Sequence, residues 1–327
     1  MSYIADEKRY ERMRYRRCGE SGLKLSAISL GLWHNFGKEA DFEACRDILK
    51  AAFDNGVTHF DLANNYGPGP GAAEENFGRV LAADFKAYRD EMIISTKAGY
   101  YMWPGPYGNG GSKKYLIASL DQSLKRMGLE YVDIFYHHRP DSETAVEETA
   151  GALDRVVRQG KALYIGISNY SPGQTEAIVK AFEELKTPFV IHQAVYNMLN
   201  RGTEKGLIDV LTKERKGLIA YSPLAQGLLT DRYFNGIPSG SRASKSAFLK
   251  PETVEKNMEK IMVLNAIARR RGQSLAQMAL AWLLNNPAVT SVLIGVSTRQ
   301  QLLQNLKAIE NTSFSEEDLK QIDEITM

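Results

Sequence analysis

The sequence has little cysteine and almost no net charge, and both shortages exclude whole classes of protein. Cys18 and Cys45 are the two cysteines in 327 residues. They belong to no CxxC pair and cannot build a disulfide framework. The 41 Lys and Arg residues nearly balance the 39 Asp and Glu residues, which leaves a formal net charge of +2. This balance gives no electrostatic reason to expect nucleic acid or an anionic membrane as a partner.

Long hydrophobic runs are also missing. No apolar run approaches the about 18 residues that a membrane-spanning helix needs, so we expect no membrane partner. The opening stretch MSYIADEKRYERMRYRRCGE is polar and charged, which does not suit a secretory signal peptide. Together with the unpaired cysteines, these features predict a reduced, cytoplasmic protein.

Metal-binding and phosphate-binding motifs are absent as well. The five histidines form no HExxH motif and no paired Cys/His spacing, so we expect no metal. The sequence has neither GxxxxGK[ST] nor GxGxxG after a strand, so P-loop and Rossmann chemistry are unsupported. His137 and His138 are adjacent, and on a strand they would point to opposite faces.

What the sequence does contain is an alternation of short apolar runs and longer amphipathic stretches. The runs are continuously apolar, as expected for parallel strands covered on both faces. Eight strand–helix units without a shift in composition predict an α/β fold, a single (β/α)8 TIM barrel domain over residues 1–327. The expected strands are 28–30, 58–61, 92–96, 133–137, 162–167, 189–193, 218–221 and 292–294.

The amphipathic stretches predict helices at 41–55, 72–81, 112–127, 145–159, 172–185, 206–213 and 299–309. Three further features lie outside the repeated units. The first is an N-terminal β-hairpin over 13–26 with Gly22 in its turn, and the second is a long loop over 224–251. The third is a pair of extra C-terminal helices at 252–271 and 315–326.

Four polar residues of different type follow consecutive predicted strands. Asp61 and Tyr66 follow the second strand, Lys97 the third and His138 the fourth. Singly, each has an ordinary explanation: a helix cap, a packed ring, a lysine reaching the rim or a core histidine. Because the carboxyl ends of barrel strands share one rim, however, the four are expected to meet there. This convergence favours a catalytic site.

The four residue types suit the reduction of a carbonyl group, which needs a hydride on carbon and a proton on oxygen. A tyrosine with a pKa near ~10 is a poor acid–base partner at neutral pH. A lysine ~4 Å away, at an effective dielectric of ~20, would favour the phenolate by at most ~4 kcal/mol. We therefore expect Lys97 to lower the pKa of Tyr66, with Asp61 offsetting the burial of the lysine. His138 would orient the carbonyl oxygen.

Several stretches then match a known family in order and spacing. They are HFDLANNYGPGPGAAEENFG, STKAGY, HHRPD, GISNY, HQAVYN, AYSPLAQGLLT and VLIGVSTRQQLLQN. Over roughly residues 13–325 the chain resembles the aldo-keto reductases, in the branch that holds potassium-channel β subunits. GLWHNFG, NNYGPGPGAAEENFGR and MWPGPYGNGGSKKY look most like the bacterial L-glyceraldehyde 3-phosphate reductase type of that family.

The resemblance implies NADPH as cofactor, Tyr66 as general acid, Asp61 and Lys97 as its tuning pair, and His138 as the group that orients the carbonyl. Two positions depart from the aldose-reductase type: Arg139 replaces a tryptophan, and Gly295 replaces a phosphate-binding lysine. The implied cofactor residues are Trp33, Asp61, Ser168, Asn169, Gln193, Tyr221, Ser222, Pro223, Leu224, Gln226, Gly227, Arg232, Arg242, Gly295, Ser297, Arg299, Gln301, Gln304 and Asn305.

The expected function is NADPH-dependent reduction of small aldehydes such as L-glyceraldehyde 3-phosphate or methylglyoxal. A substrate pocket is expected from Trp33, Tyr66, Tyr101, Trp103 and His138. A substrate phosphate would need a cation, for which Arg201, His34 and Lys113 are candidates.

Two other functions are weighed against it. One is a cofactor-sensing subunit like the channel β subunits, with little turnover, which the presence of His138 argues against. The other is a barrel with an unrelated activity. The branch resemblance also implies a homo-oligomer, a tetramer or an octamer.

Overall fold

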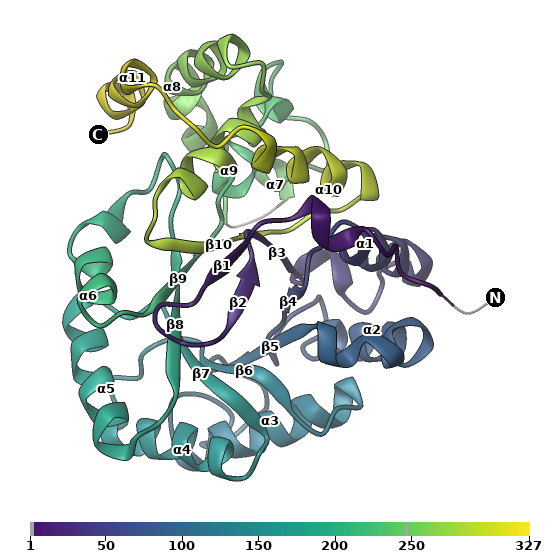
Figure 1. The fold of residues 1–327 in the computed structure, drawn as a ribbon, viewed down its shortest axis with the longest axis vertical. Coiled ribbons are helices and arrows are strands. Elements are labelled where there is room, and N and C mark those ends of the chain that lie inside the picture. Colours follow the sequence, from purple (N-terminus) through teal and green to yellow (C-terminus); the bar gives the residue numbers. More distant parts are fainter. Residues whose placement is uncertain (1–2, 246–247) are drawn as a thin grey trace.

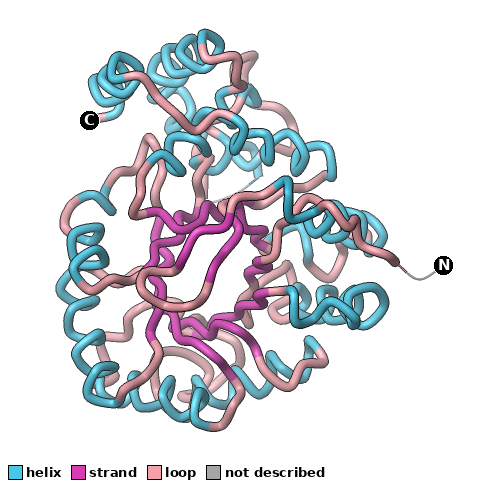
Figure 2. Tube along the Cα trace, in the orientation of Figure 1, coloured by secondary structure: helices cyan, strands magenta, loops and turns pink. Residues whose placement is uncertain are grey.

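The computed structural model describes residues 3–245 and 248–327. Within them, eight parallel strands close into a barrel in the order β10-β3-β4-β5-β6-β7-β8-β9, which lies at the centre of Figures 1 and 2. This confirms the predicted (β/α)8 TIM barrel. The strands are β3 (Ile28–Gly31), β4 (His59–Asp61), β5 (Ile93–Ala98), β6 (Val132–His137), β7 (Ala162–Ser168), β8 (Phe189–Val195), β9 (Gly217–Tyr221) and β10 (Val289–Ile294).

Helices surround the barrel, as Figure 2 shows in cyan. They are α1 (Phe42–Asp54), α2 (Ala72–Val80), α3 (Lys113–Met127), α4 (Val146–Arg158), α5 (Pro172–Leu185), α6 (Leu207–Lys213), α7 (Arg242–Lys245), α8 (Pro251–Arg270), α9 (Leu275–Asn285), α10 (Arg299–Leu306) and α11 (Glu316–Thr326). Short turns of 3-10 helix add η1 (Arg9–Arg12), η2 (His34–Phe36), η4 (Lys86–Glu91), η5 (Gly202–Glu204), η6 (Ala225–Gly227), η7 (Asp231–Tyr233) and η8 (Lys307–Glu310), and η3 (Leu81–Phe85) is a π-turn.

The predicted helices are all present, and α9 is an additional helix that the sequence reading missed. Eight of the 11 residues of α9 are buried, among them Leu280 and Trp282. A helix that is covered on nearly every side lacks the polar stripe by which periodicity identifies a helix. Its start is nevertheless marked by a capping box between Ser274 and Gln277, which is a usable sequence signal.

The N-terminal hairpin forms from β1 (Tyr15–Arg17) and β2 (Lys24–Ser26), which pair antiparallel. Gly22 lies in the connection between the two strands, as expected, and so does Gly19, which is the position that requires a glycine. Gly19 has a φ of +55°, and a Cβ atom there would lie 1.9 Å from the carbonyl oxygen of Arg215. A Cβ at Gly22 would meet open space. The contact that requires glycine at position 19 comes from the loop before β9, so it could not be seen in the hairpin sequence alone.

The hairpin packs across the end of the barrel where the strands begin. Its residues Cys18, Leu23 and Leu25 form one apolar cluster with barrel side chains that include Ile134 and Ile219. Figure 1 shows the hairpin lying in front of the strands. The hairpin therefore covers the end where the strands begin, and the end where they finish is not covered by it.

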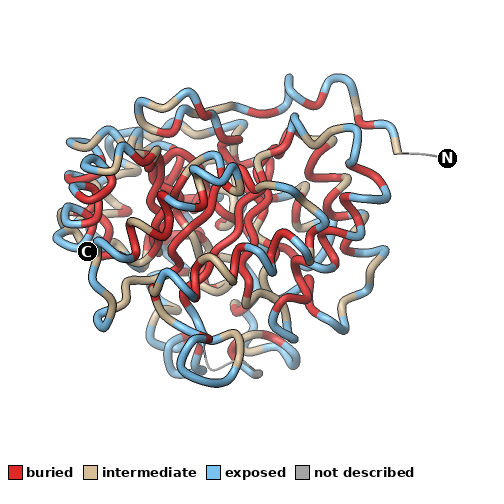
Figure 3. The backbone as a smooth tube through the Cα atoms, turned by 90° about the horizontal axis from the view of Figure 1, so that it is seen from below, coloured by how far each residue is buried: buried red, intermediate tan, exposed pale blue. Residues whose placement is uncertain are grey.

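The core consists of the barrel strands and the inner faces of the helices, drawn in red in Figure 3. Burying a large apolar side chain contributes about 1.5–3 kcal/mol, so this layer supplies the main favourable term of folding. In the described part of the chain, no helix is long and apolar enough to cross a membrane.

Candidate active site

A buried ion pair lies where β4 and β5 meet. Asp61 ends β4, Lys97 lies near the end of β5, and both side chains are fully buried. The Lys97 ammonium group contacts Asp61 Oδ2 and also donates to the carbonyl oxygen of Leu62 at 2.7 Å. Burial lowers the pKa of Lys97, and the carboxylate of Asp61 opposes that effect. The predicted Asp–Lys partnership is therefore formed.

Two further donors hold the Asp61 carboxylate. Ser95 Oγ donates to Asp61 Oδ1 at 2.6 Å, and Gln193 Nε2 approaches the same oxygen at 3.3 Å. Sequence reasoning missed Ser95. Because strand side chains alternate between faces, Ser95 lies on the same face of β5 as Lys97, and this two-residue spacing was a signal that could have found it.

Tyr66 lies in the loop between β4 and α2, next to the ion pair. The Lys97 ammonium group is 4.9 Å from the centroid of the Tyr66 ring. The Tyr66 ring meets the His138 ring nearly edge to face, with centroids 5.7 Å apart, and lies 6.2 Å from the Trp33 ring. The structure therefore brings all four predicted catalytic residues together at one rim.

The expected lowering of the Tyr66 pKa is not found. Burial raises the pKa of Tyr66 well above its usual value, and the charge of Asp61 adds to the rise. Lys97 donates its hydrogen bonds to Asp61 and the Leu62 carbonyl, and not to the Tyr66 hydroxyl. Tyr66 is thus a neutral phenol that holds its proton.

His138 is also neutral. Burial lowers its pKa well below the usual value, and the positive charge of Lys97 adds to the effect. Its Nδ1 atom is buried and has no hydrogen-bond partner among the described residues. Tyr100, which the sequence reading missed, places its ring edge to face against His138 with centroids 4.7 Å apart. The neighbouring His137 points elsewhere, to the Tyr170 hydroxyl at 2.5 Å, as expected for adjacent strand residues.

Amide side chains extend the site along β7 and β8. Asn169 adopts a left-handed φ of +64° directly after β7. Its Nδ2 donates to Ser168 Oγ at 3.1 Å and to the carbonyl oxygen of His138 at 3.0 Å, while its Oδ1 accepts from the Tyr221 hydroxyl at 2.7 Å. With Gln193 beside Asp61, four of the predicted cofactor residues adjoin the catalytic four.

The loop after β9 has an unusual backbone. Ser222, Ala225 and Gln226 have positive φ angles of +51°, +47° and +61°. Such angles are uncommon for residues other than glycine, and they gather at ligand-binding and active sites. The predicted cofactor residues Pro223, Leu224 and Gly227 belong to the same loop.

Two arginines of the long loop, Arg232 and Arg242, lie near this segment. Burial lowers the pKa of Arg242, and the charge of Arg232 lowers it further. Arg242 donates to Gln226 Oε1 and lies 5.7 Å from the Trp33 ring centroid. Neither arginine forms an ion pair with a carboxylate in residues 3–245 and 248–327. Guanidinium groups without a carboxylate partner are suited to a phosphate ligand.

The turn between β10 and α10 holds the remaining predicted cofactor residues. Ser297 donates from both its backbone N–H and its hydroxyl to Gln301 Oε1, at 3.0 and 2.9 Å. Arg299 forms an exposed ion pair with Asp47 of α1 at 3.0 Å, through Nη1 alone. Gly295, Gln304 and Asn305 lie in the same segment, and of these Asn305 is buried.

The predicted substrate residues are only partly gathered. Trp33, Tyr66 and His138 lie together, but the Tyr101 side chain is 61% exposed and Trp103 packs on Tyr115 with centroids 5.2 Å apart. Of the three cations considered for a phosphate, Arg201 is already engaged by carboxylates, those of Glu204 and Asp323.

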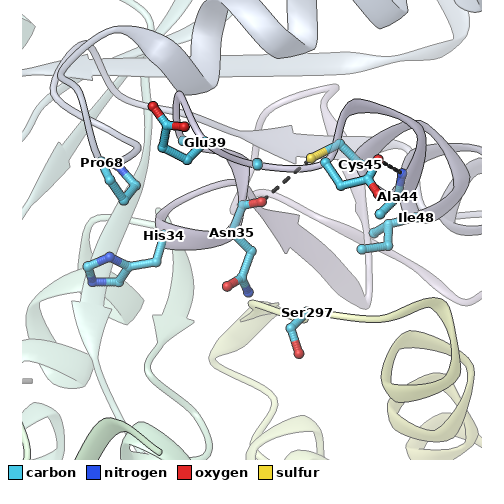
Figure 4. A pocket seen from close by; sticks show the side chains of 11 residues that line it. His34, Asn35, Glu39, Ala44, Cys45, Ile48, Pro68 and Ser297 are labelled. Carbon is cyan, nitrogen blue, oxygen red and sulfur yellow. Dashed lines mark hydrogen bonds between the residues drawn. The ribbon is translucent and has the colours of Figure 1, made fainter. Parts of the chain in front are cut away.

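A pocket of about 370 Å³ lies beside this site rather than on it. Figure 4 shows side chains from the loop after β3 and from α1, including His34, Asn35 and Cys45, facing Ser297. The Cys45 thiol donates to the Asn35 carbonyl oxygen at 3.5 Å, and burial raises its pKa to about 11. The thiol is therefore unreactive at neutral pH.

Comparison with known proteins agrees with this geometry. The sequence model of the aldo/keto reductase family matches residues 27–327. The chain is 59% identical over 330 residues to the L-glyceraldehyde 3-phosphate reductase of Escherichia coli strain K12, covering 99% of this chain and 95% of that protein. It is 38% identical over 305 residues to a probable voltage-gated potassium channel subunit beta of Arabidopsis thaliana, covering 91% and 92%. The chain belongs to the aldo/keto reductase family and is an oxidoreductase.

Proposed function

We propose that this protein reduces small aldehydes to alcohols with NADPH, with Tyr66 as the proton donor. L-Glyceraldehyde 3-phosphate and methylglyoxal are the substrates we put first. The observation that carries the proposal is the meeting of the Tyr66 and His138 rings, 5.7 Å apart, beside the buried Asp61–Lys97 pair. The similarity to proteins named L-glyceraldehyde 3-phosphate reductase supports the phosphorylated substrate.

The protonation states support this direction of reaction. Tyr66 keeps its proton at neutral pH, so it can give that proton to a carbonyl oxygen as negative charge develops there. A neutral His138 can direct an N–H toward the same oxygen without adding a charge to the site. Lys97, fixed by Asp61 beside the Tyr66 ring, stabilises the negative charge left on the phenol oxygen.

The residues around the site suit NADPH, which, when bound, supplies the hydride. Ser168, Asn169 and Gln193 would hold the nicotinamide carboxamide, and Tyr221 would stack on the ring. The left-handed segment from Ser222 to Gly227 would wrap the pyrophosphate. The phosphate groups would be neutralised by Arg232 and Arg242, whose mutual repulsion an anion relieves. Trp33, Gly295, Ser297, Arg299, Gln301, Gln304 and Asn305 would complete the cofactor site.

The proposal also includes a cytoplasmic location and a homo-oligomeric state. Both cysteines are buried as free thiols, which suits a reducing compartment. The similarity to channel β subunits supports a tetramer or an octamer.

The test is NADPH oxidation at neutral pH against both enantiomers of glyceraldehyde 3-phosphate, L-glyceraldehyde, methylglyoxal and 4-nitrobenzaldehyde, with NADH as the cofactor control. Turnover with NADPH on at least one aldehyde supports the reductase. A preference for L-glyceraldehyde 3-phosphate over L-glyceraldehyde shows that the phosphate is recognised. Tight NADPH binding without turnover on any carbonyl would overturn the proposal in favour of a cofactor-sensing subunit.

A further inference from the structure

A chain of hydrogen bonds runs from the candidate site into the interior of the barrel. Ser95 Oγ donates to Asp61 Oδ1 at 2.6 Å, and the same Oγ lies 2.9 Å from His59 Nε2. The other ring nitrogen, His59 Nδ1, lies 2.8 Å from Ser29 Oγ, which in turn lies 2.5 Å from Ser291 Oγ. All five side chains are fully buried.

The barrel geometry brings these side chains together, because they lie on the same face of neighbouring strands. His59 and Asp61 are two residues apart on β4, so they share a face. Asp61 pairs in register with Ser95 of the neighbouring β5. Ser29 of β3 pairs with Leu293 of β10, two residues from Ser291. Because β10, β3, β4 and β5 are consecutive in the barrel, the inward-facing side chains form a continuous row.

Counting protons from the Asp61 end of the row fixes one ring nitrogen of the histidine. Asp61, paired with Lys97, is a carboxylate and can only accept hydrogen bonds. Ser95 has one hydroxyl proton, which it gives to Asp61. Toward His59, Ser95 can therefore only accept, so His59 Nε2 must carry a proton.

The other ring nitrogen has the opposite role. Burial lowers the pKa of His59 to about 4, with Lys97 lowering it and Asp61 raising it, so the ring is neutral and Nδ1 accepts from Ser29. The proton of Ser29 is then used. Ser291 donates its one hydroxyl proton to the Ser26 carbonyl oxygen at 2.7 Å, so no proton is left for the contact between Ser29 and Ser291. The row is one proton short, and the shortage falls at the end away from Asp61.

We propose that His59 is a positioning residue of the candidate site: its neutral ring, protonated on Nε2, directs the Ser95 hydroxyl to Asp61 and so fixes the carboxylate that holds Lys97. This inference rests on the proposed function only for the role of Asp61 and Lys97 in turnover. The alternative state is an imidazolium, which would supply a proton to every bond of the row but would bury a second cation near Lys97.

The first experiment reads the proton positions directly. The sequence has five histidines, so 15N-histidine NMR of the full chain at pH 7 resolves few ring signals, and the signal lost in His59→Gln identifies His59. The expected pattern is a neutral ring with its proton on Nε2, unchanged down to about pH 5. A ring protonated on Nδ1, or an imidazolium at pH 7, would overturn the proposal. This result does not depend on activity, so it stands apart from failure of the reductase assay.

The second experiment tests the consequence for turnover. His59→Phe removes the donor to Ser95, and we expect kcat to fall about tenfold with KM nearly unchanged, the size of effect expected when one hydrogen bond in a charged network is lost. His59→Gln keeps an N–H donor for Ser95 and should recover most of that loss. Ser291→Ala, at the far end of the row, is the matched control and should retain wild-type kcat within about twofold.

Turnover of His59→Phe at the wild-type rate would contradict the positioning role. So would equal losses in His59→Phe and His59→Gln, because a purely structural role would not be rescued by the retained donor. If His59→Phe does not fold, as judged by circular dichroism, the NMR measurement on the wild-type chain still decides the proposal.

Discussion

The ammonium group of Lys97 lies 4.9 Å from the centroid of the Tyr66 ring but donates its hydrogen bonds to Asp61 and the Leu62 carbonyl. The lysine therefore presents its charge to the face of the ring, where a cation is attracted even though it makes no hydrogen bond to the hydroxyl. In this arrangement the phenol keeps its proton until negative charge develops on a substrate oxygen.

Replacing Tyr66 by phenylalanine removes only the hydroxyl. Loss of a general acid slows turnover by a factor of about 100 or more, so we expect NADPH-dependent reduction to fall by at least about 100-fold. The affinity for NADPH, measured by quenching of protein fluorescence, should stay within about twofold, because the hydroxyl acts in the transition state. Turnover near the wild-type rate would show that another group delivers the proton.

The exposed ion pair between Arg299 and Asp47 allows the preference for NADPH over NADH to be tested by substituting each partner in turn. Arg299→Ala removes a charge-assisted contact worth about 1.5–3 kcal/mol, so we expect the Kd for NADPH to rise about tenfold or more while the Kd for NADH changes little. Asp47→Asn frees Arg299 from an exposed ion pair worth about 0–1 kcal/mol. It should leave NADPH affinity equal or up to about fivefold tighter. Equal losses for both cofactors in Arg299→Ala would mean that this arginine does not read the 2′-phosphate.

Four buried histidines make stability depend on pH. Burial lowers the pKa values of His59, His137 and His192 to about 4 in the folded protein, and it lowers that of His138 well below its usual value. An unfolded histidine titrates near ~6.5, so between these values the unfolded chain binds protons that the folded chain does not. The free energy of unfolding therefore falls as pH drops from about 6.5 toward 4.

Urea denaturation at pH 7, 6 and 5 measures this slope. His192→Leu removes one of the protons taken up on unfolding, so its stability should fall less steeply over the same range than that of the wild type. A free energy of unfolding that is unchanged between pH 7 and 5 would mean that these rings are already charged in the folded state.

The barrel interior has no room beside Gly166 of β7. A Cβ atom there would lie 2.3 Å from the buried ring of Tyr136, and overpacking of this kind costs about 1–3 kcal/mol. Gly166→Ala should lower the free energy of unfolding by about that amount. Gly151→Ala is the control. Gly151 lies in α4 with open space around it, so this substitution should raise the free energy of unfolding by up to about 1 kcal/mol. Thermal denaturation of both variants checks the pair, and equal shifts would contradict the packing argument.

The eight barrel strands could be predicted because parallel strands covered on both faces are continuously apolar, and because a polar residue follows each one. That same rule located Asp61, Tyr66, Lys97 and His138. The helix α9 was not predicted, because a helix buried on nearly all sides lacks the regularly spaced polar residues that identify an amphipathic helix. The direction of the Tyr66 pKa could not be predicted because its main cause is the burial of the phenol, and residue spacing does not show how deeply a loop side chain is buried. Ser95 and His59 were within reach, since each lies two residues before a residue that had been identified.

The hairpin of β1 and β2 closes the end of the barrel where the strands start, so the candidate site is reached from the end where they finish. We therefore expect cofactor and aldehyde to approach from this one end of the barrel, so a molecule bound across it would hinder the binding of both.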